Sequence, residues 1–254
     1  MSKGEYPTIL FFHNKKIDTR ISMKQEFKLE RKAMRTLPES HPENHYLSKE
    51  MQAQYAIKIS EEGYFEDAKQ GILNGEYNFV LTCEEEPQLL CDRDLHHSSL
   101  ANGKKALAVG TLRFDNGMLV VVTNNSGHYR PTDEEMLNVI KILYKISQGA
   151  LYIYKSYCSS PYCSYPVSEL IKTRVFSTVK PLKQDETINQ RTGQRATINN
   201  YDTLENTQDI DRRYGRKLQS DMSTKYKGFI DSKGKSVETP LPSTSFIDTN
   251  KRKF

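Results

Sequence analysis

Two short segments hold most of the side chains in this sequence that could do chemistry. The first is His97-Ser98-Ser99, and the second runs from residue 125 to 130 as Asn-Ser-Gly-His-Tyr-Arg. A serine beside a histidine can act as a nucleophile, because the imidazole can accept the hydroxyl proton. The candidate catalytic residues are therefore His97, Ser98, Ser99, His128 and Tyr129, and the candidate binding residues are Asn125, Ser126 and Arg130.

Three interpretations of these side chains are open. The first is a hydrolase or transferase site with Asp92 or Asp94 orienting a histidine, although no Gly-x-Ser-x-Gly turn supports it. The second is a metal site built from His96, His97 and His128, which neighbouring strand residues disfavour because they point to opposite faces. The third is structural: the rings and hydroxyls satisfy buried backbone groups. We predict no metal site, and no cofactor is indicated.

A β-hairpin is expected to position the two segments. Apolar runs at 106–114 and 118–123 are joined by Asn116-Gly117, the preferred pair for a type I′ turn because both residues need positive φ. In a hairpin with that turn, Leu112 lies opposite Val121. Both polar segments then fall at the end of the hairpin that lies away from the turn.

The remaining patterns predict an α+β fold. Thr132 and Glu135 form a capping box that opens a helix, and Gly149 is the expected stop. Strands are predicted at 77–82, 88–92 and 151–157, and a helical region broken at Gly63 is predicted over 47–72. The expected architecture is an antiparallel sheet with helices packed on one face, followed by a disordered C-terminal tail.

Composition divides the chain into two regions. The apolar fraction is 36% and the mean hydropathy is -0.71, which is low for a chain that is globular throughout. Residues 176–254 carry 15 basic and 10 acidic residues, leaving 22 of each among the chain's 37 and 32. We therefore predict an α+β domain over 1–175 and a polar, basic and largely disordered tail over 176–254.

The same composition limits location and partners. No segment is long and apolar enough for a membrane span or a secretory signal, which predicts a cytoplasmic protein. Acidic residues interrupt every basic run, so nucleic acid is not favoured as a partner. Cys158 and Cys163 have zinc-like or disulfide-like spacing, but free thiols are favoured because no second Cys/His pair accompanies them.

Five short runs, in order, resemble the domain of the plant IQ-motif-containing calmodulin-binding proteins, the IQM family. They are Tyr77-Asn78-Phe79-Val80-Leu81, His97-Ser98-Ser99-Leu100-Ala101-Asn102-Gly103, Ala108-Val109-Gly110-Thr111-Leu112, Asn116-Gly117 and Ser126-Gly127-His128-Tyr129-Arg130-Pro131-Thr132. The resemblance covers about Tyr77 to Leu143. Similar segments also resemble parts of bacterial toxin and effector modules.

The resemblance implies a cytosolic interaction protein with calmodulin as a candidate partner. No Ile-Gln-x-x-x-Arg-Gly-x-x-x-Arg run occurs; the nearest stretch, Ile188–Arg195, departs from it, and Phe27–Leu37 is basic and apolar but its apolar residues lack good anchor spacing. Size and the polar tail further suggest a bacterial effector, secreted into a host cell without a signal peptide and acting on a host protein. The alternative is a toxin-like transferase or hydrolase with its His/Ser/Tyr site at the end of the hairpin, so whether the protein is an enzyme is left open.

Overall fold

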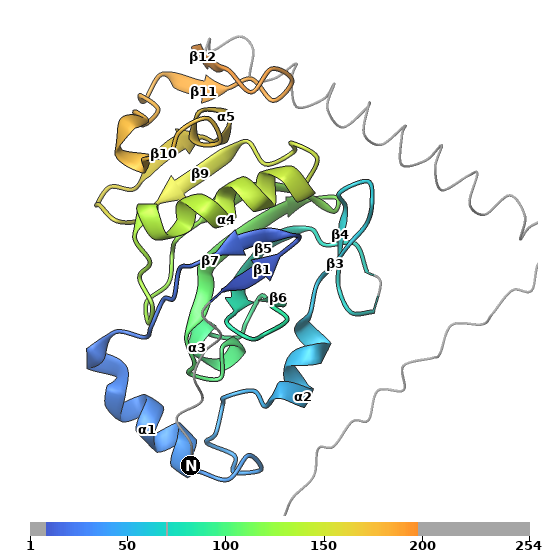
Figure 1. The fold of residues 1–254 in the computed structure, drawn as a ribbon, viewed down its shortest axis with the longest axis vertical. Helices are drawn as coiled ribbons and strands as arrows, with labels where there is room; N and C mark the ends of the chain where they lie inside the picture. Colours follow the sequence, from blue (N-terminus) through green and yellow to red (C-terminus); the bar gives the residue numbers. More distant parts are fainter. Residues whose placement is uncertain (1–8, 70, 198–254) are drawn as a thin grey trace, which may run out of the picture. The chain divides into compact units, whose positions relative to one another are not determined.

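A computed structural model describes residues 9–69 and 71–197 (Figure 1). The helices, 3₁₀ turns and strands follow one another in this order: β1 (Leu10–Phe12), β2 (Lys15–Ile17), η1 (Gln25–Phe27), α1 (Lys28–Thr36), α2 (Lys49–Gln52), η2 (Ala53–Tyr55), β3 (Lys58–Ile59), β4 (Phe65–Glu66), β5 (Gly75–Thr82), β6 (Leu89–Asp92), α3 (His97–Leu100), β7 (Ala106–Asp115), β8 (Met118–Thr123), α4 (Asp133–Ile146), β9 (Ile153–Ser156), β10 (Cys163–Pro166), α5 (Val167–Leu170), η3 (Phe176–Thr178), β11 (Glu186–Ile188) and β12 (Arg195–Thr197).

A six-stranded sheet organises the described residues, with strand order β10-β9-β8-β7-β5-β6. All neighbouring strands are antiparallel except β8 and β9, which run parallel. A parallel pair needs a crossover connection, and α4 supplies it between β8 and β9. The predicted α+β class and the predicted strands at 77–82, 88–92 and 151–157 are confirmed.

The central hairpin of β7 and β8 has the predicted turn but a different register. Asn116 and Gly117 have φ values of 47° and 82°, as a type I′ turn requires. The predicted pairing of Leu112 with Val121 is wrong, because Leu112 lies opposite Val122. An irregularity beside Phe114 leaves one extra residue on β8, and such a bulge shifts every later pair by one position.

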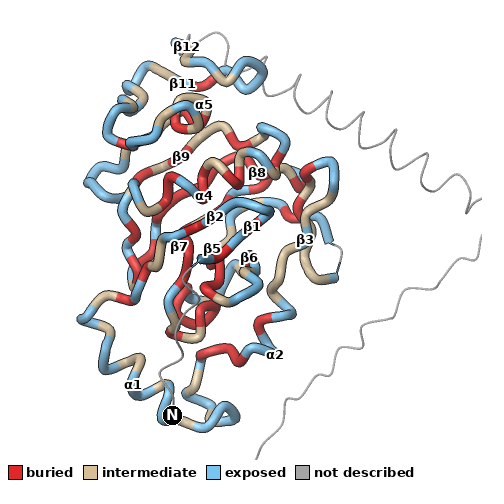
Figure 2. Tube along the Cα trace, in the orientation of Figure 1, coloured by how far each residue is buried: buried red, intermediate tan, exposed pale blue. Residues whose placement is uncertain are grey.

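Side chains from both faces of the sheet are buried. On one face, Phe79 and Leu81 of β5 pack with the apolar side of α4. On the other, Val80 packs with Leu100 of α3 and with residues near the start of the chain. The long helix covers one face as predicted, while a short helix and irregular segments cover the second (Figures 1 and 2).

The start and end of α4 follow the sequence signals. The Thr132 hydroxyl accepts a hydrogen bond from the Glu135 backbone, and the Glu135 carboxylate accepts one from the Thr132 N–H at 2.7 Å. Beyond the last turn, the Gly149 N–H donates to the Tyr144 carbonyl at 2.9 Å with φ of +83°. Both local predictions are therefore confirmed.

The helical region predicted over 47–72 is wrong. Only α2 and the 3₁₀ turn that follows it are helical, after which the chain forms the small β3–β4 hairpin. Gly63 lies in the connection with φ of +83°, and Phe65 is fully buried with its N–H bonded to the Gly117 carbonyl at 2.8 Å. Contacts with the β7–β8 turn therefore override the helical spacing of the apolar residues.

Part of the predicted tail lies within the described residues. The 3₁₀ turn η3 and the strands β11 and β12 fall between residues 176 and 197, and Phe176 is 5% exposed among core residues. The boundary at 175/176 remains a prediction, and the predicted disorder over 198–254 lies outside the described residues.

Candidate functional site

The two polar segments singled out by the sequence lie next to each other. The first forms the short helix α3, so His97 is helical rather than on a strand as the sequence suggested. The second is the loop between β8 and α4. The rings of His96 and His128 are 6.3 Å apart between centroids, and the Tyr129 hydroxyl donates to the Lys104 carbonyl at 2.7 Å. The fold thus brings the candidate residues together.

His97 is committed to the backbone of β7. Its Nε2 lies 2.7 Å from the Gly110 carbonyl oxygen, which can only accept, so Nε2 carries the proton. The pKa of His97 is lowered to about 4, mainly by burial; the hydrogen bond to Gly110 opposes this shift, and the neighbouring His128 and His96 add to it. A neutral ring whose Nε2 donates to a carbonyl leaves that nitrogen unable to accept a proton from a nucleophile.

Two of the buried candidate hydroxyls make no hydrogen bond to a histidine. Ser98 is 0% exposed and Ser126 is 5% exposed, and the Oγ atoms of both are without a hydrogen-bond partner. An activated serine is recognised by its bond to a base. Tyr129 is fully buried as well, so the catalytic roles proposed for these residues remain predictions that this geometry does not favour.

His128 instead contacts the N-terminal helical segment. Its Nε2 lies 3.0 Å from a Glu30 carboxylate oxygen, and its ring packs on Phe27 with centroids 4.2 Å apart. The next exposed side chain, Arg130, pairs with Glu26 at 2.7 Å. These contacts place 3₁₀ turn η1 and α1 over the loop. No sequence pattern indicated Glu26 or Glu30, because their partners are far away along the chain.

Further contacts attach α1 to the same surface. The second oxygen of Glu30 lies 3.4 Å from the Tyr46 hydroxyl and 3.7 Å from His45 Nε2, and Arg35 donates to the Gly103 carbonyl at 3.2 Å. Burial and Glu30 raise the pKa of Tyr46 to about 12. None of the nine residues of α1 is buried, however, and Leu29 is 79% exposed. The helix is therefore held mainly by polar contacts.

A second polar cluster fixes the loop where it joins β8 and α4. Asp133, the first residue of α4, accepts hydrogen bonds from Tyr154 at 2.6 Å and from Ser156 at 2.9 Å. Asn124 donates to the Pro131 carbonyl at 3.0 Å and accepts from the Tyr157 N–H at 2.7 Å. Burial and the Asp133 carboxylate raise the pKa of Tyr154. This network joins β8, α4 and β9.

The remaining candidates and the cysteines have simple surroundings. Asn125 is exposed, and its N–H donates to Thr123 Oγ1 at 3.0 Å. Cys158 and Cys163 are free thiols.

In the described part of the chain, no group of three or more His, Cys, Asp or Glu residues is arranged to hold a metal ion. Within the same ranges, no helix has the length and apolar character to cross a bilayer.

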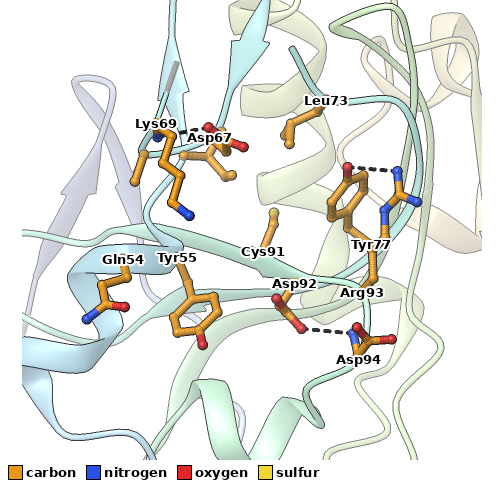
Figure 3. A pocket seen from close by; sticks show the side chains of 12 residues that line it. Gln54, Tyr55, Asp67, Lys69, Leu73, Tyr77, Cys91, Asp92, Arg93 and Asp94 are labelled. Atoms are coloured by element: carbon orange, nitrogen blue, oxygen red, sulfur yellow. Dashed lines mark hydrogen bonds between the residues drawn. The ribbon is translucent and has the colours of Figure 1, made fainter. Parts of the chain in front are cut away.

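A cavity of about 270 Å³ lies away from these loops, beside the end of β6 (Figure 3). Its walls combine charged, aromatic and apolar side chains, which are Gln54, Tyr55, Ile57, Asp67, Ala68, Lys69, Leu73, Tyr77 and residues 91–94. Sequence reasoning missed this site, because three segments that show no shared motif come together only in the fold.

The region that matches known proteins includes α3, the loop between β8 and α4 and the cavity residues, but not η1 or α1. Residues 54–136 match the IQ motif-containing protein middle domain. This confirms the resemblance, with a match that begins upstream of Tyr77 and ends within α4. IQ domain-containing protein IQM3 of Arabidopsis thaliana is 32% identical over 92 residues, which cover 36% of this chain and 20% of that protein. The aligned part thus spans about a fifth of this relative, and no solved structure matches significantly.

Proposed function

We propose that this protein is an interaction protein whose helix α1 is bound by a calcium sensor of the calmodulin class. The observation that carries the proposal is a basic helix that has no buried residue and displays Leu29 at 79% exposure. The likeness to IQ motif-containing proteins supports the same class of partner. Calmodulin-type proteins bind amphipathic helices by enclosing their apolar side chains.

The charge of α1 suits an acidic partner. Within Lys28–Thr36 there are four basic residues, Lys28, Arg31, Lys32 and Arg35, against the single acid Glu30. A basic amphipathic helix is typical of calmodulin targets and of membrane-surface segments. Phe27, Met34 and Leu37 are partly buried, so a partner that lifts the helix would gain further apolar contacts.

The attachment of α1 is of a kind that a partner can replace. The hydrogen bond between Glu30 and His128 and the ion pair of Glu26 with Arg130 join side chains that are between 22% and 56% exposed. Pairs at such exposure contribute little, about 1 kcal/mol or less each, since water competes for both charges. Docking of a partner therefore does not have to break a buried core.

Titration of the full chain with calcium-loaded calmodulin by calorimetry tests the proposal. We expect binding that weakens at least tenfold in Leu29→Glu, because a carboxylate would enter an apolar groove of an acidic protein. Met51→Glu is the matched control, since Met51 is also a helical, exposed apolar residue at 46% exposure. Absence of binding, or equal binding by both variants, would contradict the proposal.

The finer hypotheses from the sequence receive no support from the relatives. Secretion into a host cell, a host-protein target and a toxin-like activity remain predictions, as does a cytoplasmic location. The hydrolase or transferase alternative needs an accessible hydroxyl bonded to a base, and the unpartnered Ser98 and Ser126 do not supply one.

A further inference from the structure

The cavity beside β6 combines apolar side chains with charged walls. Its lining includes the apolar side chains of Leu73 and Cys91, which are 3% and 6% exposed, and that of Ile57. Lys69 comes from the loop after β4, and the acids Asp92 and Asp94 come from the end of β6 (Figure 3). The lining therefore combines apolar side chains with charged groups of both signs: Lys69 and Asp67 on one wall, and Asp92, Arg93 and Asp94 on the other.

The opposite charges on these two walls do not neutralise each other. Among the described residues, Lys69 and Asp94 make no ion pair, and Figure 3 shows the Lys69 ammonium group directed into the cavity. Asp92 uses one carboxylate oxygen to accept from the N–H groups of residues 94 and 95, both at 2.8 Å. Its second oxygen and the Asp94 carboxylate are left to bind a donor.

The other two charged groups of the lining, Arg93 and Asp67, keep their charges but use their hydrogen-bonding atoms on neutral groups of the protein. Arg93 donates to the Tyr77 hydroxyl at 3.0 Å and to the Asn74 carbonyl, and its guanidinium lies over the Tyr77 ring. Asp67 accepts from the Lys69 and Gly71 backbone N–H groups, both at 2.8 Å. The groups available to a ligand are thus Lys69 on one side and Asp92 with Asp94 on the other.

We propose that this cavity binds a free α-amino acid with an apolar side chain. The ligand carboxylate would pair with Lys69, its ammonium group with Asp92 and Asp94, and its side chain would pack on the apolar side chains of the lining. A zwitterion matches both walls at once, whereas a purely anionic or cationic ligand would face a like charge. A volume of about 270 Å³ is small for a ligand site and suits a molecule of this size.

Calorimetry of the full chain with three probes that share a 3-methylbutyl group tests the charge requirement. L-leucine carries both charges, 3-methylbutylamine lacks the carboxylate, and 4-methylpentanoate lacks the ammonium group. We expect leucine to bind and each analogue to bind at least tenfold more weakly. No binding of leucine at millimolar concentration, or equal binding of an analogue, would overturn the proposal. Stronger binding of glucose, an uncharged ligand, would overturn it as well.

Two variants then locate the site. Lys69→Met and Asp94→Asn should each weaken leucine binding at least tenfold, and both side chains are exposed, so the fold should persist. Lys58→Met is the matched control, because Lys58 is an exposed lysine on β3 that does not line the cavity. Leucine binding that survives Lys69→Met and Asp94→Asn would also overturn the proposal.

Discussion

The loop between β8 and α4 has two parts with opposite characters. The first part, the Asn124 end, is where the loop joins β8 and α4 at Asn124 and Asp133, and the second, the His128 end, is the tip around His128 and Arg130. At the Asn124 end, Asn124, Tyr154 and Ser156 are buried, and the network of Asn124 and Asp133 bonds to the Pro131 carbonyl, to β9 and to the residue that follows β9. At the His128 end, the partners are Glu26 and Glu30 of the N-terminal helical segment, and the charged groups are partly exposed.

The difference indicates which contacts stabilise the fold and which can be replaced by contacts with water or with another protein. A buried polar group that loses its partner carries the full cost of its desolvation, whereas water replaces the partner of an exposed group. We therefore expect substitutions at the Asn124 end to reduce stability, and substitutions at the His128 end to change how α1 is attached.

The largest effect is expected from Gly110→Ala, beside the buried end. A Cβ at Gly110 would lie 1.9 Å from the Thr123 carbonyl oxygen, a contact with backbone that cannot rotate away. We expect destabilisation beyond about 4 kcal/mol, enough to prevent folding. Soluble yield and far-ultraviolet circular dichroism measure the effect, and Gly127→Ala is the control because nothing lies within 4 Å of its added Cβ.

Asp133→Ala should lower the free energy of unfolding by roughly 3–4 kcal/mol. The substitution leaves the Tyr154 and Ser156 hydroxyls buried without their acceptor, at about 1–3 kcal/mol for each group. Urea denaturation measures the loss. Tyr154→Phe, which removes one donor but keeps the carboxylate, should cost less than Asp133→Ala; the reverse order would contradict the central role of the carboxylate.

His97 should make stability depend on pH. Its pKa is about 4 in the folded protein against 6.5 for an ordinary histidine, so the unfolded chain binds more protons between these values. The contribution of neutral His97 to the free energy of unfolding is thus fully present above pH 6.5. It is lost as the pH decreases toward 4, by roughly 3 kcal/mol. Urea denaturation at several pH values should show a shallower decline in His97→Gln, and equal slopes would contradict the assignment.

The smallest stability effect is expected at the exposed end. Arg130→Ala removes an ion pair with Glu26 between side chains that are 56% and 53% exposed, so we expect a change of less than about 0.5 kcal/mol. Proteolysis of the 24–36 segment should nevertheless become faster as α1 detaches more often. A loss of stability like that of Asp133→Ala would remove the distinction between the two ends.

Local signals in the sequence predicted local structure well. The capping box at Thr132 and the Asn116-Gly117 turn involve residues within three positions of each other, so neighbours in the chain determine them. The β3–β4 hairpin was missed because it depends on contact with the distant β7–β8 turn, and the bulge beside Phe114 was missed because no residue type there marks it.

The site was predictable only in part for the same reason. The hairpin brought the two polar segments together as expected, yet the partner of His128 is Glu30, 98 positions away. The cavity beside β6 likewise joins Tyr55, Lys69 and Asp94, which share no spacing that would mark them as neighbours.

The crossover between β8 and β9 has a consequence for how the matched region behaves in isolation. The match ends at residue 136, in the first turn of α4, whereas the helix continues to Ile146 and β9 completes the parallel pair. A fragment limited to 54–136 would lack Val139, Ile140 and Leu143, whose buried side chains cover the sheet. Such a fragment would expose that apolar face and one edge of β8, and we expect it to aggregate rather than fold autonomously.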